Sequence, residues 1–307
     1  MKRTVLLVIS ILAAFSGFAQ SLPDPDATYL YAERDSCNLY MDVYEPSGQA
    51  RASVIYVFGG GFFTGSRDGK EAREWFGKLI ANGYRVISID YRLGLKGYHG
   101  AGLNREFIEA TRNAINLAVE DLFSATAFII ENSREIGIDP GLLIVSGSSA
   151  GAITAMQAEW DICNGDELAD VLPEDFNYAG VISFSGALYN YEGGPVYAKE
   201  PCPTLMFHGT ADKIVPYDKV KLGKLYFGGS KSLATAYEKA GFNYNIYRFK
   251  DNDHGIAGSM MRNLDEELRF LEANVLHKER RIIDATVSDP VLKNSRTASG
   301  SFEDLYN

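Results

Sequence analysis

The chain has 307 residues, of which 46% are hydrophobic and 12% aromatic, and its formal net charge is −10. This length and composition fit one α/β domain that can bury a substantial core. The negative charge argues against nucleic acid as a partner.

The N-terminus has the pattern of a targeting segment. Two basic residues precede an apolar run over 5–15, and small residues stand at 17 and 19, the positions that a signal peptidase reads. We therefore predict a signal peptide over 1–19 with cleavage before Gln20, and a secreted or periplasmic protein. The alternative is a membrane anchor, but the apolar run is short for a span, so no stable membrane insertion is expected after cleavage.

Residues 20–276 alternate between strand and helix patterns and form the predicted catalytic domain. Apolar and polar side chains alternate over 29–34 and 39–44, which predicts an N-terminal antiparallel hairpin. Nearly continuous apolar runs, typical of parallel strands buried on both faces, follow at 53–58, 84–89, 142–146, 181–184, 204–207 and 244–249. Helical patterns lie between and after them, at 71–81, 106–134, 152–160, 233–239 and 256–276.

This alternation predicts an α/β fold with a mainly parallel sheet and helices on both faces. From His277 the periodicity fades, so 277–307 is predicted to be a C-terminal tail. Cys37, Cys163 and Cys202 allow one disulfide with one thiol left over, and the sequence does not choose the pair. The cysteine spacing matches no metal motif, and with four histidines in the chain we expect no metal site.

The segment 142–151 carries the strongest functional signal. Its apolar run ends in Gly147-Ser148-Ser149-Ala150-Gly151, and an alanine-rich helical pattern follows. A Gly-x-Ser-x-Gly turn between a strand and a helix is the setting of a nucleophile elbow. Ser149 is therefore the predicted nucleophile.

A serine nucleophile needs a base to take its proton and an acid to orient that base. Sheet hydrolases supply them in the chain order serine, Asp or Glu, histidine, from loops at strand ends. Asp212 follows the strand at 204–207 and His254 follows the strand at 244–249. We predict Asp212 as the acid and His254 as the base.

Other candidates for these two roles are present. His99 lies in a glycine-rich loop and could line a pocket, and His277 lies beyond the last helix, where a surface position is expected. His208 stands at a strand end, where an imidazole would brace the loop by hydrogen bonds. Asp251 and Asp253 remain alternatives for the acid, although they lie close to His254 in sequence.

A tetrahedral intermediate needs hydrogen-bond donors aimed at its oxyanion. The backbone N–H of Ala150, directly after the nucleophile, is the first predicted donor. Three glycines follow the strand at 53–58, and glycine lets a backbone approach a substrate closely. Gly60 and Gly61 are the other predicted donors.

These motifs jointly resemble the α/β-hydrolase esterases of the hormone-sensitive-lipase and carboxylesterase type. The resemblance covers roughly residues 50–260 and rests on Phe58-Gly59-Gly60-Gly61-Phe62-Phe63, Asp90-Tyr91-Arg92-Leu93, Gly137-Ile138-Asp139-Pro140, the elbow, the 208–216 loop and Asp253-His254-Gly255. It implies an eight-stranded α/β-hydrolase sheet and an acyl-transfer mechanism without a cofactor.

The chain departs from that family in several places. Phe58 stands where the family usually has a histidine that braces the oxyanion loop, and Ser148 stands where an acidic residue is frequent. The segment after Leu93 lacks the usual Ala-Pro-Glu continuation. The N-terminal portion is too short for a large helical cap.

Three segments are expected to face the substrate. They contain Phe62 and Phe63, Tyr98 and His99, and Tyr189. Tyrosines in a loop can stack on sugar or phenolic rings, and the alternative is that they only pack the loop. Together with export, this favours removal of acetyl or aromatic acyl groups from polysaccharides or oligosaccharides, an interpretation that rests on family analogy.

Two other functions fit the same motifs. One is a serine peptidase of the prolyl-oligopeptidase type, although such enzymes usually have a second glycine where this chain has Ala152. The other is a non-catalytic binding protein on the same fold. Such a protein would be expected to have lost a member of the Ser149, Asp212 and His254 set.

Overall fold

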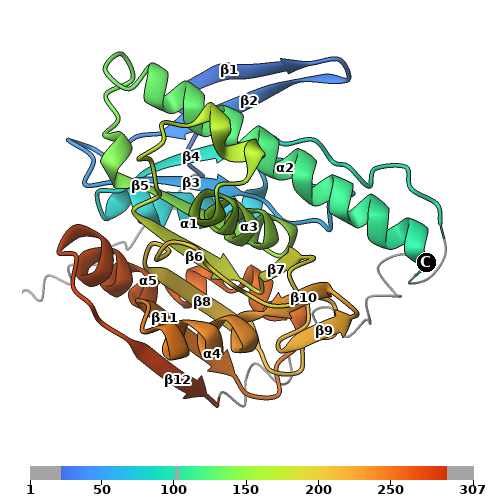
Figure 1. Cartoon of the computed structure of the whole chain (residues 1–307). Helices are drawn as coiled ribbons and strands as arrows, with labels where there is room; N and C mark the ends of the chain where they lie inside the picture. The colour runs from blue at the N-terminus through green and yellow to red at the C-terminus, as the bar shows by residue number, and fades with distance from the viewer. Residues whose placement is uncertain (1–21, 101–103, 289–307) are drawn as a thin grey trace, which may run out of the picture.

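The computed structural model describes residues 22–100 and 104–288 (Figure 1). The predicted signal peptide over 1–19 and the last nineteen residues of the predicted tail lie outside these ranges. The main element is a nine-stranded sheet in the order β1-β2-β4-β3-β5-β6-β8-β11-β12. Its strands are β1 (Ala27–Arg34), β2 (Cys37–Tyr44), β3 (Ser53–Val57), β4 (Arg85–Ile89), β5 (Leu143–Ser148), β6 (Gly180–Phe184), β8 (Thr204–Gly209), β11 (Tyr244–Phe249) and β12 (Ile283–Val287).

The predicted mainly parallel sheet with an N-terminal antiparallel hairpin is confirmed. β1 pairs with β2 and β2 with β4 in antiparallel register, whereas every later pairing in this sheet is parallel. β5, which leads into the elbow, occupies the centre of the sheet. The carboxyl ends of the parallel strands therefore meet at one edge, where ligands bind in open α/β folds.

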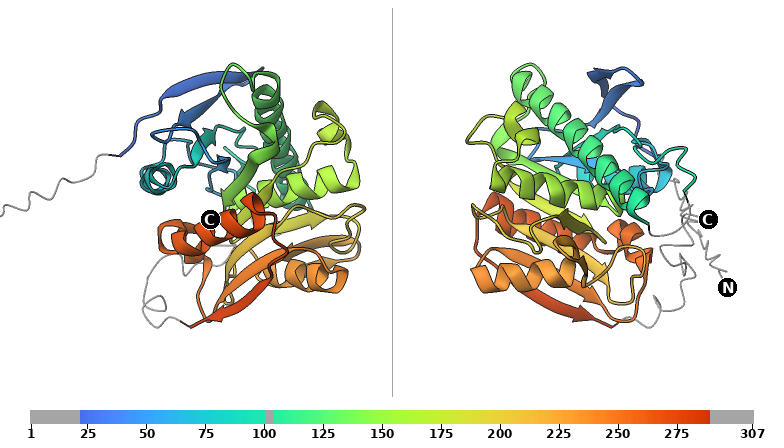
Figure 2. Two further views of the ribbon diagram at one scale, coloured as in Figure 1. Left: turned by 90° about the vertical axis from the view of Figure 1, so that its left-hand side faces the viewer. Right: turned by 45° about the vertical axis from the view of Figure 1, so that its right-hand side comes forward.

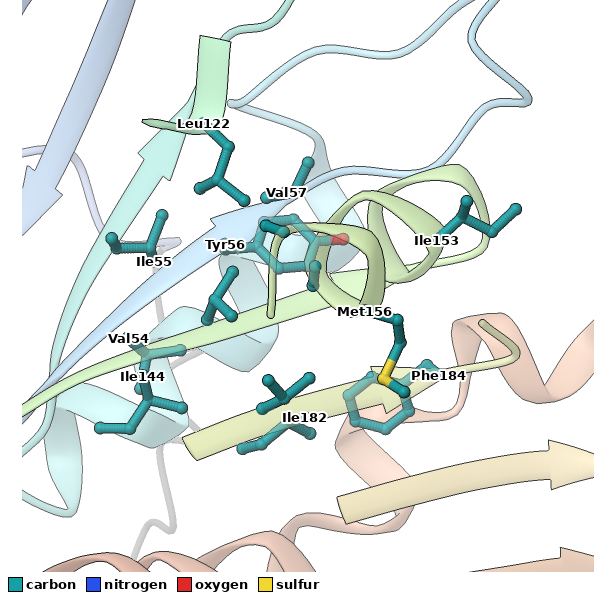
Figure 3. Close-up of a cluster of buried hydrophobic side chains, with 14 of the residues drawn as sticks. Val54, Ile55, Tyr56, Val57, Leu122, Ile144, Ile153, Met156, Ile182 and Phe184 are labelled. Atoms are coloured by element: carbon teal, nitrogen blue, oxygen red, sulfur yellow. The ribbon is translucent and has the colours of Figure 1, made fainter. Parts of the chain in front are cut away.

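Helices cover both faces of the sheet. α2 (Arg105–Glu131), α3 (Ala150–Asn164) and α4 (Ser230–Ala240) lie on one face, and α1 (Lys70–Ala81) and α5 (Leu264–Phe270) lie on the other (Figure 2). By length and apolar composition α2 could cross a membrane, but 56% of its most apolar window is buried inside the molecule. The buried apolar residues of α2 are therefore part of the hydrophobic core. Leu122 lies there near side chains from β3, β5, β6 and α3 (Figure 3).

The sheet has one strand more than the resemblance implied. β12 forms from residues predicted as tail and pairs in parallel with β11. The Nη2 of Arg248 lies 2.8 Å from Oδ2 of Asp284, and the backbone N–H of Ile283 donates to the side-chain oxygen of Asn245. A strand of five residues at the sheet edge, half exposed and preceded by a charged run, has only a weak apolar signal in sequence.

A second, three-stranded sheet was not predicted. It has the order β7-β10-β9, with β7 (Ala187–Asn190), β9 (Lys219–Leu222) and β10 (Leu225–Gly229). It replaces part of the loop expected to carry Tyr189. The pairing of β7 with β10 joins residues far apart in the chain, such as Tyr189 and Phe227, so local pattern could not reveal it. β9 and β10 form a local hairpin, but their strands are short.

The helix predicted over 256–276 is broken. It consists of 3-10 turns at His254–Gly258 and Met260–Arg262, then α5, then a π-helical turn at Leu271–Leu276. The side chain of Ser259 donates to the carbonyl of Ile256, and that of Asn263 donates to the carbonyl of Ser259. Such local side-chain bonds compete with regular helical bonding, which explains the break.

All three cysteines are free in the structure. Cys37 is exposed, whereas Cys163 and Cys202 are both buried beside Glu159. An oxygen of Glu159 lies 3.4 Å from the Cys163 sulfur and accepts from the backbone N–H of Cys202. Burial raises the pKa of the Cys163 thiol, which keeps it protonated.

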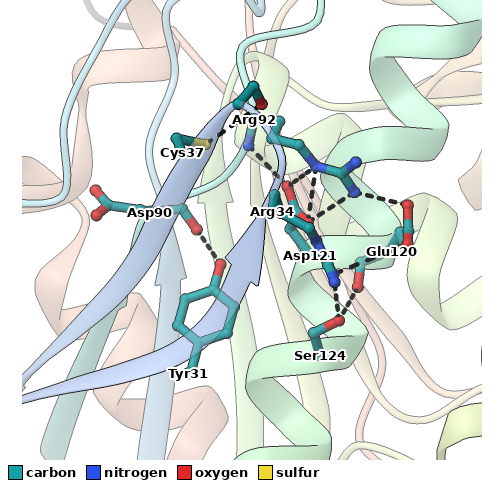
Figure 4. Close-up of polar contacts among 9 residues, drawn as sticks. Tyr31, Arg34, Cys37, Asp90, Arg92, Glu120, Asp121 and Ser124 are labelled. Atoms are coloured by element: carbon teal, nitrogen blue, oxygen red, sulfur yellow. Dashed lines mark hydrogen bonds and ion pairs between the residues drawn. The ribbon is translucent and has the colours of Figure 1, made fainter.

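A buried carboxylate joins the N-terminal hairpin to the strand-end loop after β4 and to α2. Asp121 on α2 is fully buried and binds the guanidinium groups of Arg34 and Arg92, at 3.1 and 2.8 Å (Figure 4). It also accepts from the backbone N–H of Arg92. Glu120 beside it contacts both arginines but is 44% exposed.

Asp121→Ala is expected to lower the free energy of unfolding by about 3 kcal/mol or more, because it leaves two partly buried guanidinium groups without their shared partner. Urea unfolding at pH 7 measures the loss. Glu120→Ala is the matched control and is expected to cost less than about 1 kcal/mol, since its ion pairs are exposed to solvent. Equal losses in the two variants would contradict a special role for Asp121.

Candidate active site

Ser149 lies in a strained turn between β5 and α3. Its φ of 51° and ψ of −116° fall outside the regions that L-residues favour, and its backbone N–H donates to the carbonyl of Phe184 at 2.9 Å. Glycine is required on both sides. A Cβ at Gly147 would lie 2.2 Å from the backbone of Gly151, and a Cβ at Gly151 would lie 2.0 Å from the carbonyl oxygen of Val57. The turn therefore holds the Ser149 hydroxyl at the carboxyl end of the central strand.

His254 meets this hydroxyl directly. Its Nε2 lies 2.8 Å from Ser149 Oγ, and it begins the 3-10 turn that follows β11. The turn is set by Asp251, whose φ is 59°, and by the Asp253 carboxylate, which accepts from the N–H of Gly255. The loop after β11 thus places the imidazole over the elbow.

Asp212 is the carboxylate that contacts His254. Its Oδ2 lies 2.7 Å from His254 Nδ1, and its Oδ1 accepts from the backbone N–H groups of Ile214 and Val215 at 2.9 and 3.0 Å. Burial by itself would raise the pKa of Asp212, but hydrogen bonds from His208 and His254 hold that pKa below its usual range. Asp212 is therefore ionised at neutral pH, and its orienting role stays a prediction.

The loops that carry Asp212 and His254 are bonded to each other. Ala211 N donates to Asn252 O at 2.9 Å, and Asp251 N donates to the hydroxyl of Thr210 at 2.8 Å. A Cβ at Gly209 would lie 2.4 Å from the carbonyl oxygens of both Asn252 and Asp253. This close approach sets the separation of the acid and the base.

The predicted oxyanion loop packs against the elbow. Gly60 and Gly61 have φ values of 117° and 63°, and a Cβ at Gly59 would lie 3.4 Å from the Cβ of Ser149. The N–H of Ala150 is at the first position of α3, where a helix has no internal acceptor for it. The structure thus places Gly59 and the N–H of Ala150 beside Ser149, and the donor roles of Gly60, Gly61 and Ala150 stay predictions.

The two departures from the family pattern have structural counterparts. The Phe58 ring stacks on Tyr91 with centroids 4.3 Å apart, and the Tyr91 hydroxyl donates to the Phe58 carbonyl at 2.9 Å, so the loop is braced without a histidine. Ser148 Oγ donates to the carbonyl of Ala257 at 2.7 Å. This bond ties the elbow to the His254 turn.

The predicted substrate contacts fall into two groups. Phe62 is 3% exposed and packs edge-on against Tyr91, so it supports the loop and offers no surface to a substrate. Tyr98 also packs inward, against Phe107. Phe63 is half-buried and His99 is exposed.

Tyr189 lies on the small sheet and is largely buried. Its hydroxyl donates to that of Tyr191, which is 40% exposed, and the guanidinium of Arg112 lies over the Tyr191 ring. Tyr191 is therefore the more accessible of the two rings. It lies directly after β7, in the segment that the sequence predicted to face the substrate.

The remaining histidines differ in their surroundings. His277 is exposed and pairs with Glu272, as its position after the last helix predicted. His208 is fully buried and braces its loop through Ser230 and the Val215 carbonyl, and it also approaches Asp212. Within residues 22–100 and 104–288, no group of three His, Cys, Asp or Glu side chains is placed to hold a metal ion.

Comparison with known proteins agrees with this geometry. The profile of the BD-FAE family matches residues 41–186, which contain the oxyanion loop and the elbow. Thermogutta terrifontis esterase 2 with bound propionate superposes with a TM-score of 0.61 at 21% identity, over 82% of this chain and 94% of that one. The chain therefore has the α/β-hydrolase fold and is similar in sequence to carboxylesterases and lipases.

The curated relatives of this α/β-hydrolase are esterases and lipases. Secreted lipase 1 of Botryotinia fuckeliana is 28% identical over 174 residues, covering 54% of this chain and 27% of that protein. Para-nitrobenzyl esterase of Bacillus subtilis is 30% identical over 131 residues, covering 41% of this chain and 25% of that protein. The matched segment thus spans only about a quarter of each relative's length.

Proposed function

We propose that this α/β-hydrolase is an exported serine esterase that deacylates polysaccharides or oligosaccharides. The observation that carries the esterase proposal is the unbroken chain of hydrogen-bonding contacts from Ser149 through His254 to Asp212, at 2.8 and 2.7 Å. Three residues from three separate strand-end loops meet in the geometry that acyl transfer by serine requires. Export rests on the N-terminal sequence pattern.

The first half of the reaction follows from this geometry. His254 Nε2 accepts the proton of Ser149 as its Oγ attacks the ester carbonyl, and Asp212 stabilises the resulting imidazolium through Nδ1. The N–H groups of Gly60, Gly61 and Ala150 are the proposed donors to the oxyanion. His254 then protonates the departing alcohol, and an acyl-enzyme on Ser149 remains.

The second half repeats the sequence with water. His254 removes a proton from water, the hydroxide attacks the acyl carbonyl, and Ser149 leaves with the returned proton. No redox change occurs, so the groups of this chain can account for the reaction.

A polysaccharide or oligosaccharide substrate is supported by the aromatic corner that follows β6. Tyr191 is 40% exposed, and its ring meets Tyr189 edge-on. Exposed aromatic rings of this kind stack on sugar and phenolic rings. The corner follows the strand whose last carbonyl accepts from Ser149 N, which supports the proposal that it contacts the sugar of a bound ester.

Rates on acetylated and feruloylated oligosaccharides, on p-nitrophenyl esters and on peptides test this function. We expect turnover of the esters and none of the peptides, with kcat/KM higher for an acylated oligosaccharide than for the p-nitrophenyl ester of the same acid. Tyr191→Ala should remove that preference and leave the p-nitrophenyl rate unchanged. Turnover of peptides alone would replace the esterase proposal with a peptidase.

Activity is expected to fall below about pH 6, because the base must be neutral to accept the serine proton. The lowered pKa of Asp212 keeps that carboxylate ionised between about pH 6 and pH 4, so only the proton on His254 should affect activity there. The logarithm of kcat/KM should therefore fall with a slope of one. A flat profile down to about pH 4 would contradict His254 as base, and a slope of two would contradict an ionised Asp212.

A further inference from the structure

We propose that His208 is a positioning residue that fixes the carboxylate of Asp212 and so sets the pH range in which His254 works. The inference rests on the proposed esterase function and extends it to a buried group outside the Ser149, His254 and Asp212 set. His208 does not touch Ser149, and its effect is transmitted through Asp212.

The protonation of His208 follows from its neighbours. Its Nε2 lies 3.1 Å from the carbonyl oxygen of Val215 and 3.3 Å from Oδ2 of Asp212. Both of these groups accept hydrogen bonds, so Nε2 carries a proton. Nδ1 lies 2.8 Å from the hydroxyl of Ser230, which can donate to it. An imidazole with its proton on Nε2 satisfies all these contacts at once.

With this tautomer, Asp212 has two donors on each oxygen. Oδ1 accepts from the N–H groups of Ile214 and Val215, and Oδ2 faces the imidazoles of His254 and His208. The carboxylate cannot rotate without breaking several of these bonds. His208 shares Oδ2 with His254, so it both holds the oxygen in place and weakens its pull on the His254 proton.

Other charged and titratable groups also lie near His208. The ring of Tyr217 packs on His208 with centroids 5.6 Å apart. Arg248, the register neighbour of His208 on β11, hydrogen-bonds to Tyr217, and Lys231 pairs with Asp218 nearby. None of these side chains stands between His208 and Asp212 in the described contacts. Asp212 is therefore the group through which loss of His208 would act on His254.

Removal of His208 should shift the pH profile in a fixed direction. Without the His208 N–H, Oδ2 is a stronger acceptor for His254 Nδ1–H, and a positive dipole near the imidazolium is gone. Both changes favour the protonated form of His254. The acidic limb of kcat/KM should then move to higher pH, by about half to one pH unit.

His208→Leu and His208→Gln form the matched pair that tests this. In glutamine, Nε2 can replace the donor at the imidazole Nε2 and Oε1 can accept from Ser230, whereas leucine offers neither. We expect His208→Leu to lower kcat about tenfold or more, with KM little changed and the acidic limb shifted upward, and His208→Gln to restore most of both. An unshifted limb in His208→Leu, or a glutamine variant no better than leucine, would overturn the proposal.

A measurement on the unmodified side chains covers the case in which His208→Leu does not fold. The chain has four histidines, so ¹⁵N-histidine NMR of the full protein resolves each ring. We expect His208 to carry a proton on Nε2, and Ser230→Ala to leave that proton in place. A proton on Nδ1 alone would overturn the proposal.

The NMR experiment also separates this inference from the proposed function. The His254 resonances titrate whether or not the protein turns over an ester, and their midpoint should move upward in His208→Leu. Absence of any esterase activity together with that shift would reject the proposed function and keep the positioning role. Esterase activity without a shift of the His254 midpoint in His208→Leu would keep the proposed function and reject the positioning role of His208.

Discussion

Ser149→Ala is expected to reduce kcat for short p-nitrophenyl esters on the order of a million-fold, to the residual rate that binding and the oxyanion donors provide. The hydroxyl is the group that lies 2.8 Å from His254 Nε2, and no other hydroxyl is shown at that position. Alanine carries the same Cβ as serine, so the turn at φ 51° keeps its strain and the fold should be unchanged. Initial rates, with thermal unfolding as a check on folding, measure the effect.

Ser146→Ala is the control for this variant. Ser146 lies on the same strand, is fully buried and makes no hydrogen bond among the described residues through its hydroxyl. It should therefore retain nearly all activity. Turnover by Ser149→Ala above a trace would remove the nucleophile assignment and favour a different enzymatic mechanism on this fold.

Asp212→Asn is expected to reduce kcat on the order of ten-thousand-fold, by analogy with other serine triads. The physical reason lies in the four donors around the carboxylate. An amide oxygen placed at Oδ1 still accepts from Ile214 and Val215, but the amide NH₂ then faces His254 Nδ1. His254 is forced into the tautomer with its proton on Nε2, which cannot accept the proton of Ser149.

The same substitution decides between the possible acids. Asp253 binds the N–H of Gly255 and Asp251 is exposed, so Asp251→Asn and Asp253→Asn should each keep activity within about tenfold. The kcat values of the three variants, measured on one p-nitrophenyl ester, are compared directly. A small loss in Asp212→Asn with a large loss in either other variant would transfer the orienting role to that residue.

The order of motifs in the chain was enough to predict most of the site. Strand ends can be recognised because a buried parallel strand is a continuous apolar run, and small residues must surround a nucleophile elbow. Ser149, Asp212 and His254 each directly follow such a feature. Sequence offsets could not show whether the three loops meet, because that depends on the strand order β5-β6-β8-β11.

Buried packing and long-range pairing account for what the sequence did not predict. Phe62 was predicted to contact the substrate because it follows the three glycines. In the structure it has a positive φ, and its ring packs inward against Tyr91. β12 pairs with β11, and β7 with β10, across distant parts of the chain, and short strands have little local signal.

The stretch 142–151 and the glycines at 59–61 were enough by themselves to predict a hydrolase elbow and an oxyanion loop, because such backbones have no room for larger side chains. Only the tertiary structure decided how Asp212 is held. His208 lies four residues before Asp212, and its place at a strand end predicted only that it braces the loop. In the structure its Nε2 lies 3.3 Å from Oδ2 of the Asp212 carboxylate. That contact depends on a tight turn after β8 and on Ser230 from α4, which no local pattern encodes.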